Sequence, residues 1–361
     1  MDELQIVLIA FSISSVLILS LHPIAKRIGL VDVPGGRKHH SREVPLIGGI
    51  SIFVSFIAAL YFADLHYPGM ESLLTGALLL VILGVLDDFY ELSAWFRFTS
   101  QVVVALLVYF LGGKTIENVG SVFGGDNLHL GIFAVPFTIF SMVGIINALN
   151  MIDGVDGLAG SLSLVALAFF AVFANLSDRH PTLMVLAVLS AAVTAFLLFN
   201  LRLPGRPYAM VFMGDAGSMF LGFTLCWFAI GLSQGNDRVM APVTALWILA
   251  VPVFDTLSAM MRRVLGGASP FTADRGHLHH ILMRRLQENQ HNVQITVGVI
   301  LFLATALGLI GMLLEKLQVP ETLSLSLLLV CFVGYFRFVL VSHQEKRDTR
   351  LISRQAGEPE N

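Results

Sequence analysis

Long apolar runs alternate with short polar segments along almost the whole chain. Each run approaches the roughly 20 residues that an α-helix needs to cross a bilayer. Backbone amides find no water inside a bilayer, so each run must be a helix or part of a closed barrel, and the runs lack barrel-like alternation. The pattern predicts an all-α polytopic membrane bundle of about eleven helices. They are expected near 4–22, 46–63, 72–87, 96–112, 131–149, 159–176, 182–200, 216–232, 241–261, 295–314 and 321–341.

The composition supports a membrane protein. Of 361 residues, 56% are hydrophobic and only 13% are charged, against roughly 25% charged in soluble domains. Asp2 and Glu3 precede the first run where a secretory signal would carry basic residues, so we expect a retained span. Cys226 and Cys331 lie inside apolar runs and are expected to be small buried hydrophobes.

The distribution of Lys and Arg predicts the orientation. If the N-terminus is outside, 18 of these residues lie on one side and 4 on the other. Cytoplasmic loops carry the excess, so we expect a cytoplasmic C-terminus, with 343–361 as a polar, disordered cytoplasmic tail. The basic face suits phosphates or anionic lipid headgroups, although topological sorting alone also explains it. On the other face, the Gly-rich stretch 113–130 is expected to form a turn or short hairpin.

Two adjacent carboxylates end the third run. Asp87 and Asp88 stand in Leu-Asp-Asp-Phe-Tyr-Glu. Neighbouring carboxylates repel each other at a membrane boundary, and a helix C-terminus is unfavourable for anions. The pair therefore predicts a bound cation, with a solvated helix end as the alternative.

A second polar motif joins the fifth and sixth runs. It is Asn-Ala-Leu-Asn-Met-Ile-Asp-Gly-Val-Asp-Gly, which places Asn147, Asn150, Asp153 and Asp156 three residues apart. On a helix these side chains would lie on or near one face. Gly154 would let the backbone or a ligand approach closely. Polar caps around a tight turn are the alternative interpretation.

The third motif, Val-Phe-Met-Gly-Asp-Ala-Gly-Ser at 211–218, precedes the eighth run. Asp215 lies where a helix is expected to begin. Amides at a helix start attract phosphate, and an Asp beside them can hold the Mg²⁺ that accompanies a diphosphate. A simple N-cap Asp is the alternative.

The fourth motif lies in the polar segment 262–294 and contains Arg275, His277, His279 and His280. Without a Cys partner or an H-E-x-x-H spacing, zinc is not expected. The oxygen ligands of the other motifs suit Mg²⁺, with Mn²⁺ as the alternative. We interpret Arg275 and the histidines as phosphate-binding or transition-state-stabilising groups, the histidines titrating near neutral pH.

The basic turn at 35–49 contains Lys38 and Arg42. These residues are candidates to bind a lipid phosphate at the interface. Their alternative role is a topology signal or contact with lipid headgroups.

Taken together and in this order, the motifs closely resemble the polyprenyl-phosphate N-acetylhexosamine-1-phosphate transferase family over about residues 20–290. Ala-Pro-Val-Thr-Ala-Leu-Trp at 241–247 and the His-x-His-His arrangement resemble the bacterial branch that joins N-acetylglucosamine-1-phosphate to undecaprenyl phosphate. The phospho-MurNAc-pentapeptide branch would show three consecutive histidines, and here Leu278 interrupts the run.

The resemblance implies roles for individual residues. Asp87, Asp88 and Asp215 would serve Mg²⁺ and the reacting phosphates. The remaining residues it implicates would bind the uridine or support the site: Asn150, Asp153, Gly154, Val155, Asp156 and Phe212.

The resemblance also implies an activity. Residues 1–342 would form one transmembrane catalytic domain with cytoplasmic active-site loops in the bacterial inner membrane. It would transfer N-acetylglucosamine-1-phosphate from UDP-N-acetylglucosamine to undecaprenyl phosphate, with UMP as the other product, starting O-antigen or enterobacterial common antigen. UDP-sugar, undecaprenyl phosphate and membrane lipids are the expected partners, nucleic acid is not, and a homodimer stays open.

Alternatives remain at this stage. The donor could be UDP-MurNAc-pentapeptide, UDP-GalNAc or UDP-FucNAc. An intramembrane prenyltransferase would also use Asp-rich motifs with Mg²⁺, but its N-x-x-x-D-x-x-x-D spacing is absent. A transporter would place polar groups in the middle of broken helices, whereas here they gather at one face.

Overall fold

The predicted all-α fold is confirmed. The computed structural model describes residues 2–33, 42–65, 67–112, 115–269, 276–286 and 290–355. Within these ranges the chain forms the helices α1 (Glu3–Ile28), α2 (Gly48–Phe62), α3 (Met70–Tyr90), α4 (Ala94–Gly112), α5 (Ala134–Ile152), α6 (Leu158–Leu176), α7 (His180–Asn200), α8 (Gly214–Ser233), α9 (Pro242–Ile248), α10 (Ala250–Leu265), α11 (Leu278–Arg285), α12 (Gln290–Lys316) and α13 (Glu321–Gln355). A 3-10 turn, η1 (Gly131–Phe133), precedes α5, and β1 (Val31–Asp32) pairs antiparallel with β2 (Val44–Pro45).

Nine helices of the described chain are long and apolar enough to cross a membrane. They match nine of the eleven predicted spans. The second span is present as the shorter helix α2, and the ninth, 241–261, is not one straight helix. It is broken into α9 and α10, which meet at 81°.

Pro252 explains the break. It has no N–H to donate to the carbonyl four residues earlier, and its ring clashes with that carbonyl, so the helix cannot continue straight through the run. The final helix differs from expectation in another way. The backbone of 343–355 continues α13 as a helix, where a disordered tail was expected.

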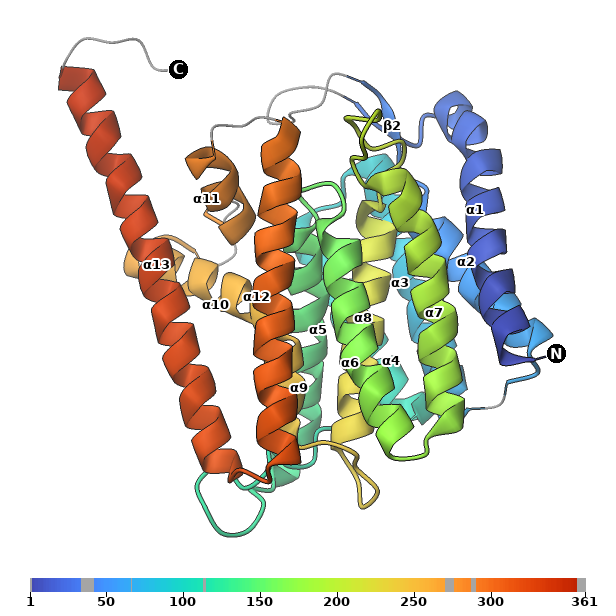
Figure 1. Ribbon diagram of the computed structural model, residues 1–361, viewed down its shortest axis with the longest axis vertical. Helices are drawn as coiled ribbons and strands as arrows, with labels where there is room; N and C mark the ends of the chain where they lie inside the picture. Colours follow the sequence, from blue (N-terminus) through green and yellow to red (C-terminus); the bar gives the residue numbers. More distant parts are fainter. Residues whose placement is uncertain are drawn as a thin grey trace.

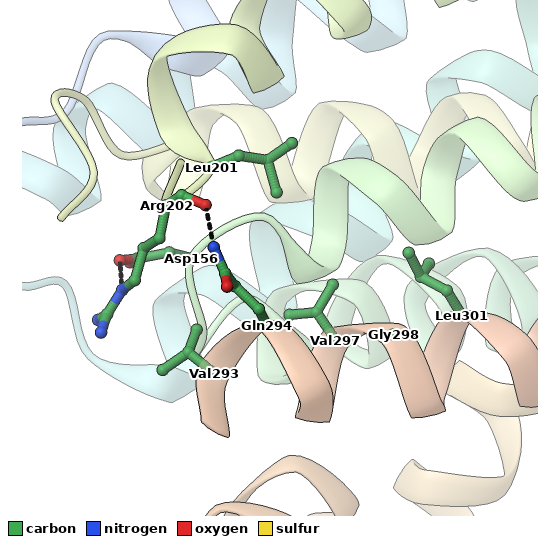
Figure 2. Close-up of a pocket in the computed structure, with 8 residues that line it drawn as sticks. All are labelled: Asp156, Leu201, Arg202, Val293, Gln294, Val297, Gly298 and Leu301. Carbon is green, nitrogen blue, oxygen red and sulfur yellow. Dashed lines mark hydrogen bonds and ion pairs between the residues drawn. The ribbon is translucent and has the colours of Figure 1, made fainter. Parts of the chain in front are cut away.

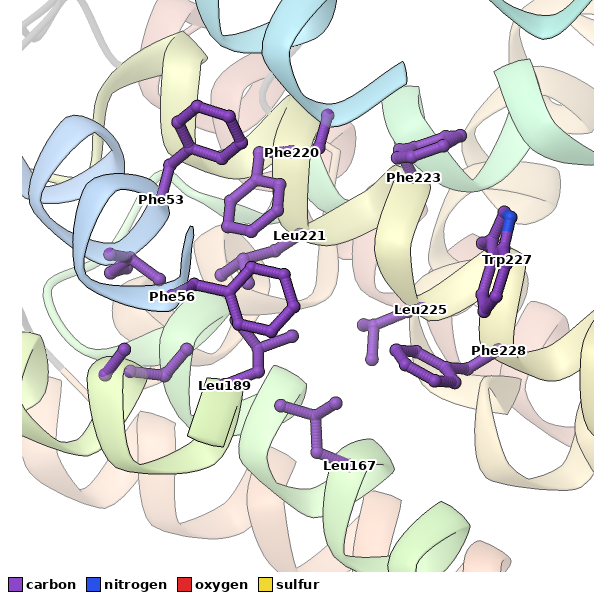
Figure 3. Close-up of a cluster of buried hydrophobic side chains, with 14 of the residues drawn as sticks. Phe53, Phe56, Leu167, Leu189, Phe220, Leu221, Phe223, Leu225, Trp227 and Phe228 are labelled. Carbon is purple, nitrogen blue, oxygen red and sulfur yellow. The ribbon is translucent and has the colours of Figure 1, made fainter. Parts of the chain in front are cut away.

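Helix α8 lies at the centre of the bundle, where α2, α3, α5 and α6 pack around it (Figure 1). Aromatic side chains of α2 and α8 fill the core (Figure 3). Small residues allow the closest approaches: a Cβ added at Gly84 of α3 would clash with the backbone of Ala216. Membrane helices commonly pack backbone to backbone in this way. The approach brings the end of α3 onto the start of α8.

The polar motifs gather at one end of the bundle, the upper end in Figure 1. There lie the β1–β2 ribbon, α11 and the connections α5–α6 and α7–α8. We call this the motif end. The opposite end carries a short hairpin, as expected for 113–130, with Asn118 paired to His129 in its described part.

Candidate active site

Asp87 lies in the last turn of α3, and the residue that follows the helix, Glu91, has a left-handed backbone conformation (φ 49°). It is 4% exposed. Its carboxylate accepts the backbone N–H of Leu92 at 2.8 Å and the guanidinium of Arg97 at 2.8 Å. Arg97 of α4 thus supplies one positive charge at the point where the carboxylates gather.

Asp88, also on α3, caps the N-terminus of α8. Its carboxylate accepts the backbone N–H groups of Asp215 at 2.9 Å and Ala216 at 3.4 Å, at the N-terminus of α8. An anion is stabilised there by the helix dipole and the unpaired amides. In the structure a protein carboxylate therefore caps two of these amides, and phosphate binding at this helix start stays a prediction.

Asp215 links three further helices. Asn150 of α5 donates an N–H to its Oδ1 and also one to Ser218 Oγ at 2.9 Å. Arg97 lies 3.8 Å from Asp215 Oδ2 and 2.8 Å from Asp87 Oδ2, so the two carboxylates lie beside the same guanidinium. We call Asp87, Asp88 and Asp215 the acidic cluster.

The turn 153–157 completes this side of the site. Helix α5 ends at Ile152, and Asp153 follows as its C-cap with φ −71° and ψ 40°. Asn147 and Asn150 therefore share a helix but Asp153 and Asp156 do not, which corrects the prediction of a common face. Burial, then the negative charges of Asp215, Asp156 and Asp88, raise the pKa of Asp153 well above its usual range. Asp153 thus lies close to the acidic cluster.

Asp156 faces the other way. Its Oδ2 accepts the Nε–H of Arg202 at 2.7 Å, and the two side chains are 11% and 25% exposed. The pair borders a pocket of about 200 Å³ whose other walls are Leu201 and the first turns of α12 (Figure 2). Sequence reasoning did not include Arg202 in the site.

The histidine motif is bonded to another buried carboxylate, that of Asp255, which the sequence analysis did not predict as a site residue. Asp255 of α10 accepts from Nδ1 of His277 at 2.7 Å, from the N–H of Leu278 at 2.8 Å and from the hydroxyl of Tyr335 at 2.7 Å. It therefore ties α10, α11 and α13 together. A signal was available, because a lone Asp within an apolar run is expensive in a membrane protein.

His279 is 1% exposed, and its buried Nε2 has no hydrogen-bond partner among the residues that the structure describes. A Cβ added at Gly154 would lie 2.9 Å from this atom, so the ring faces the 153–157 turn. Burial first, and then the positive charge of His280, lower the pKa of His279 to about 3. The expectation that it titrates near neutral pH is wrong, because a desolvated imidazole stays neutral.

Two further predicted residues that the structure describes, Arg42 and Phe212, contact neighbouring segments. Lys38 and Arg275 lie outside the described residues. The guanidinium of Arg42 stacks over the ring of Tyr208, 4.3 Å from its centroid. The backbone of Phe212 pairs with the 45–48 segment, through Pro45 O and the N–H of Gly48, both at 2.9 Å.

The predicted metal is not supported by a ready-made cage. Among the residues that the structure describes, no group of three or more His, Cys, Asp or Glu has the arrangement of a metal site. The carboxylates of the acidic cluster nevertheless crowd together, with the guanidinium of Arg97 beside Asp87 and Asp215. Crowded hard oxygens with little positive charge fit a divalent cation such as Mg²⁺.

The fold and site define a class, a polytopic helical membrane protein whose buried carboxylates meet at one end of the bundle. Residues 70–233, from α3 to α8, match the model of glycosyl transferase family 4. A Yersinia pestis protein named undecaprenyl-phosphate alpha-N-acetylglucosaminyl 1-phosphate transferase is 37% identical over 314 residues, which cover 86% of this chain and 84% of that protein.

Proteins of the same name show similar agreement. The one from Escherichia coli K12 is 36% identical over 314 residues, with 86% of this chain and 84% of that protein covered. The one from Haemophilus influenzae is 35% identical over 337 residues, 92% of each. The chain therefore belongs to glycosyl transferase family 4, and the family membership predicted from its motifs is confirmed.

Proposed function

We propose that this protein transfers N-acetylglucosamine-1-phosphate from UDP-N-acetylglucosamine to undecaprenyl phosphate, giving undecaprenyl-diphosphate-N-acetylglucosamine and UMP. The observation that carries the proposal is the acidic cluster, built from α3 and α8 at one end of a membrane bundle. The names of the relatives support the donor and acceptor.

The reaction needs little covalent help from the protein. An oxygen of the lipid phosphate attacks the β-phosphorus of the donor, and the bond from that phosphorus to the bridging oxygen breaks as UMP leaves. A phosphomonoester has a second pKa near 6, so at pH 7 the nucleophile is mostly a dianion already. The site must instead bring two anions together and stabilise the charge that moves to UMP.

Asp87, Asp88 and Asp215 are proposed to hold Mg²⁺, with Mn²⁺ as the alternative ion. When bound, the ion neutralises the diphosphate and polarises it toward attack. We add Arg97 to the proposed site residues, because its guanidinium lies beside both Asp87 and Asp215. In the absence of a metal ion it serves as the counter-ion of these two carboxylates.

Other groups are proposed to bind the substrates. Asp153, Asn150, Gly154, Val155, Asp156 and Phe212 are assigned to the uridine side, and Lys38, Arg42, Arg275, His277, His279 and His280 to the phosphates. His279 serves as a neutral hydrogen-bonding group in this proposal, because its pKa of about 3 excludes a charged ring at neutral pH. His277 is oriented for this by Asp255.

The motif end is proposed to face the cytoplasm, with the N-terminus outside and the protein in the bacterial inner membrane. UDP-sugars are cytosolic and too highly charged to enter lipid, whereas the polyprenyl tail stays in it, so the reaction belongs at this interface. The product is proposed to start O-antigen or enterobacterial common antigen.

Transfer of radiolabel from UDP-GlcNAc to undecaprenyl phosphate by purified protein in detergent, with and without Mg²⁺, tests the proposal. We expect Mg²⁺-dependent labelled lipid and stoichiometric UMP, lost in Asp215→Asn. Asp237→Asn, at the opposite end, is the matched control and should stay active. Transfer only from UDP-GalNAc or another UDP-sugar would correct the donor, and no transfer from any UDP-sugar by folded protein would refute the reaction.

A further inference from the structure

The segment that follows α7 is fastened to the 153–157 turn. Asn200, buried at the end of α7, accepts the N–H of Gly157 at 2.7 Å and donates to the carbonyl of Val211 at 2.8 Å. Leu201 packs on Gly157, whose φ of +83° and lack of a Cβ permit the contact. The backbone before Arg202 is therefore fixed relative to both the turn and the segment that leads to α8.

From this fixed backbone, Arg202 reaches Asp156. Its Nε–H donates to Oδ2 at 2.7 Å, while its two terminal nitrogens extend away from the aliphatic side chains of the pocket (Figure 2). Oδ2 is thereby engaged, whereas no donor among the described residues is bonded to Oδ1, which can accept a hydrogen bond from a ligand. A charge-assisted bond of this geometry fixes the direction of the carboxylate.

Helix α12 is attached to the same residue. The side-chain amide of Gln294 donates to the backbone carbonyl of Arg202 at 2.6 Å. Arg202 therefore connects three parts of the site: the end of α7, the 153–157 turn and the start of α12.

We propose that Arg202 is a positioning residue for the nucleotide: it holds the Asp156 carboxylate in the orientation that binds the uridine end of the donor. This inference rests on the proposed function, in which Asp156 contacts the uridine. It predicts that losing the guanidinium weakens donor binding specifically, because Asp156 keeps its charge but loses its fixed direction. The lipid phosphate should bind as before.

The test is a kinetic double-mutant cycle with Arg202→Gln, Asp156→Asn and the double variant, plus Arg202→Lys. Arg202→Gln should raise the KM for UDP-GlcNAc about tenfold, with little change in kcat or in the KM for undecaprenyl phosphate. Arg202→Lys should restore part of the loss. In the Asp156→Asn background, Arg202→Gln should add nothing, because its partner is already altered. Arg179→Gln, which removes the arginine of an ion pair at the opposite end, is the matched control and should change neither KM.

Two results would overturn the inference. One is that Arg202→Gln raises the KM for UDP-GlcNAc equally in the wild-type and Asp156→Asn backgrounds; the other is that it raises both KM values in parallel and lowers the Tm. Wild-type transfer is measured first, so a failure of the proposed reaction is seen separately. In that event the dissociation constant of UMP, measured by calorimetry on the same variants, decides: a weakening by Arg202→Gln that is absent in the Asp156→Asn background supports the role of Arg202, and unchanged binding refutes it.

Discussion

The two ends of the bundle use acidic residues in opposite ways. At the opposite end, Glu321 accepts from Arg238 at 3.1 Å and from the N–H of Ser121 at 3.0 Å, and Glu315 accepts from the N–H of Ala241 and from Thr244. These carboxylates hold loops and helix ends in place, and each is surrounded by donors.

At the motif end the carboxylates of the acidic cluster also accept hydrogen bonds, but in addition they lie close to one another. Asp87 and Asp215 share the guanidinium of Arg97, and Asp88 is bonded to the start of α8. The negative charges of Asp215 and Asp88 contribute to the raised pKa of Asp153. Crowded, poorly compensated charges destabilise a fold, and they persist where a ligand or ion supplies the missing charge. Carboxylates that donors surround hold loops and helix ends in place, whereas carboxylates that crowd together are the ones we propose to bind a cation.

The largest expected effect separates activity from stability. Asp215→Asn should lower the transfer rate at least about 100-fold, while the Tm stays the same or rises because repulsion within the acidic cluster falls. Glu321→Gln should do the reverse, reducing stability by about 1 kcal/mol with activity retained. Transfer assays and thermal unfolding of both variants check this, and a fall of Tm in Asp215→Asn would break the contrast between the ends.

Gly154→Ala should have the next largest effect. The added Cβ would lie 2.9 Å from Nε2 of His279 and push the ring or the turn out of place. Activity should fall about ten- to a hundredfold, because small displacements in a site are expensive. Gly144→Ala on α5, where nothing lies near the added Cβ, is the matched control and should retain activity. Equal transfer rates in the two variants would show that activity does not depend on the position of the His279 ring beside Gly154.

The pH dependence of stability should reveal the buried imidazole. The folded-state pKa of His279 is about 3 and its ordinary value is 6.5, so between these values the unfolded chain binds the extra proton. The stability that the neutral His279 contributes is fully present above pH 6.5. As the pH falls from 6.5 toward 3, the free energy of unfolding should decrease by up to about 1.4 kcal/mol per pH unit. Unfolding in detergent across pH 4–7 measures it. His279→Gln should flatten the slope, and His129→Gln, on the exposed hairpin, should leave it; a slope unchanged by His279→Gln would contradict the burial of the ring.

The smallest effect is expected for Arg179→Ala. Its ion pair with Asp237 is short, at 2.7 Å, but the side chains are 39% and 74% exposed. Such pairs contribute about 0–1 kcal/mol, so Tm and activity should stay within error of wild type. A large loss of either would mean that the opposite end does more than support the fold.

The amino-acid sequence alone was enough to predict the membrane class, the location of nearly every span and the chemical character of the motifs. The thickness of the bilayer sets the length of an apolar run that can cross it, and the lack of water inside the bilayer requires each such run to be a helix. The hydrophobic pattern along the chain is therefore enough to locate the spans. The motifs also sit directly beside spans, which fixes their grouping at one end. Family membership followed from their order along the chain.

Tertiary structure decided which groups meet. Asp88 caps α8 because α3 and α8 approach through small residues, and Arg97, Arg202 and Asp255 join the site from elements whose own sequences carry no motif for it. Pro252 marks where the ninth span can break, but the bend of 81° was not predicted. Side-chain partners across helices depend on how each helix is rotated and how deeply it packs, and a hydrophobic pattern does not encode those two quantities residue by residue.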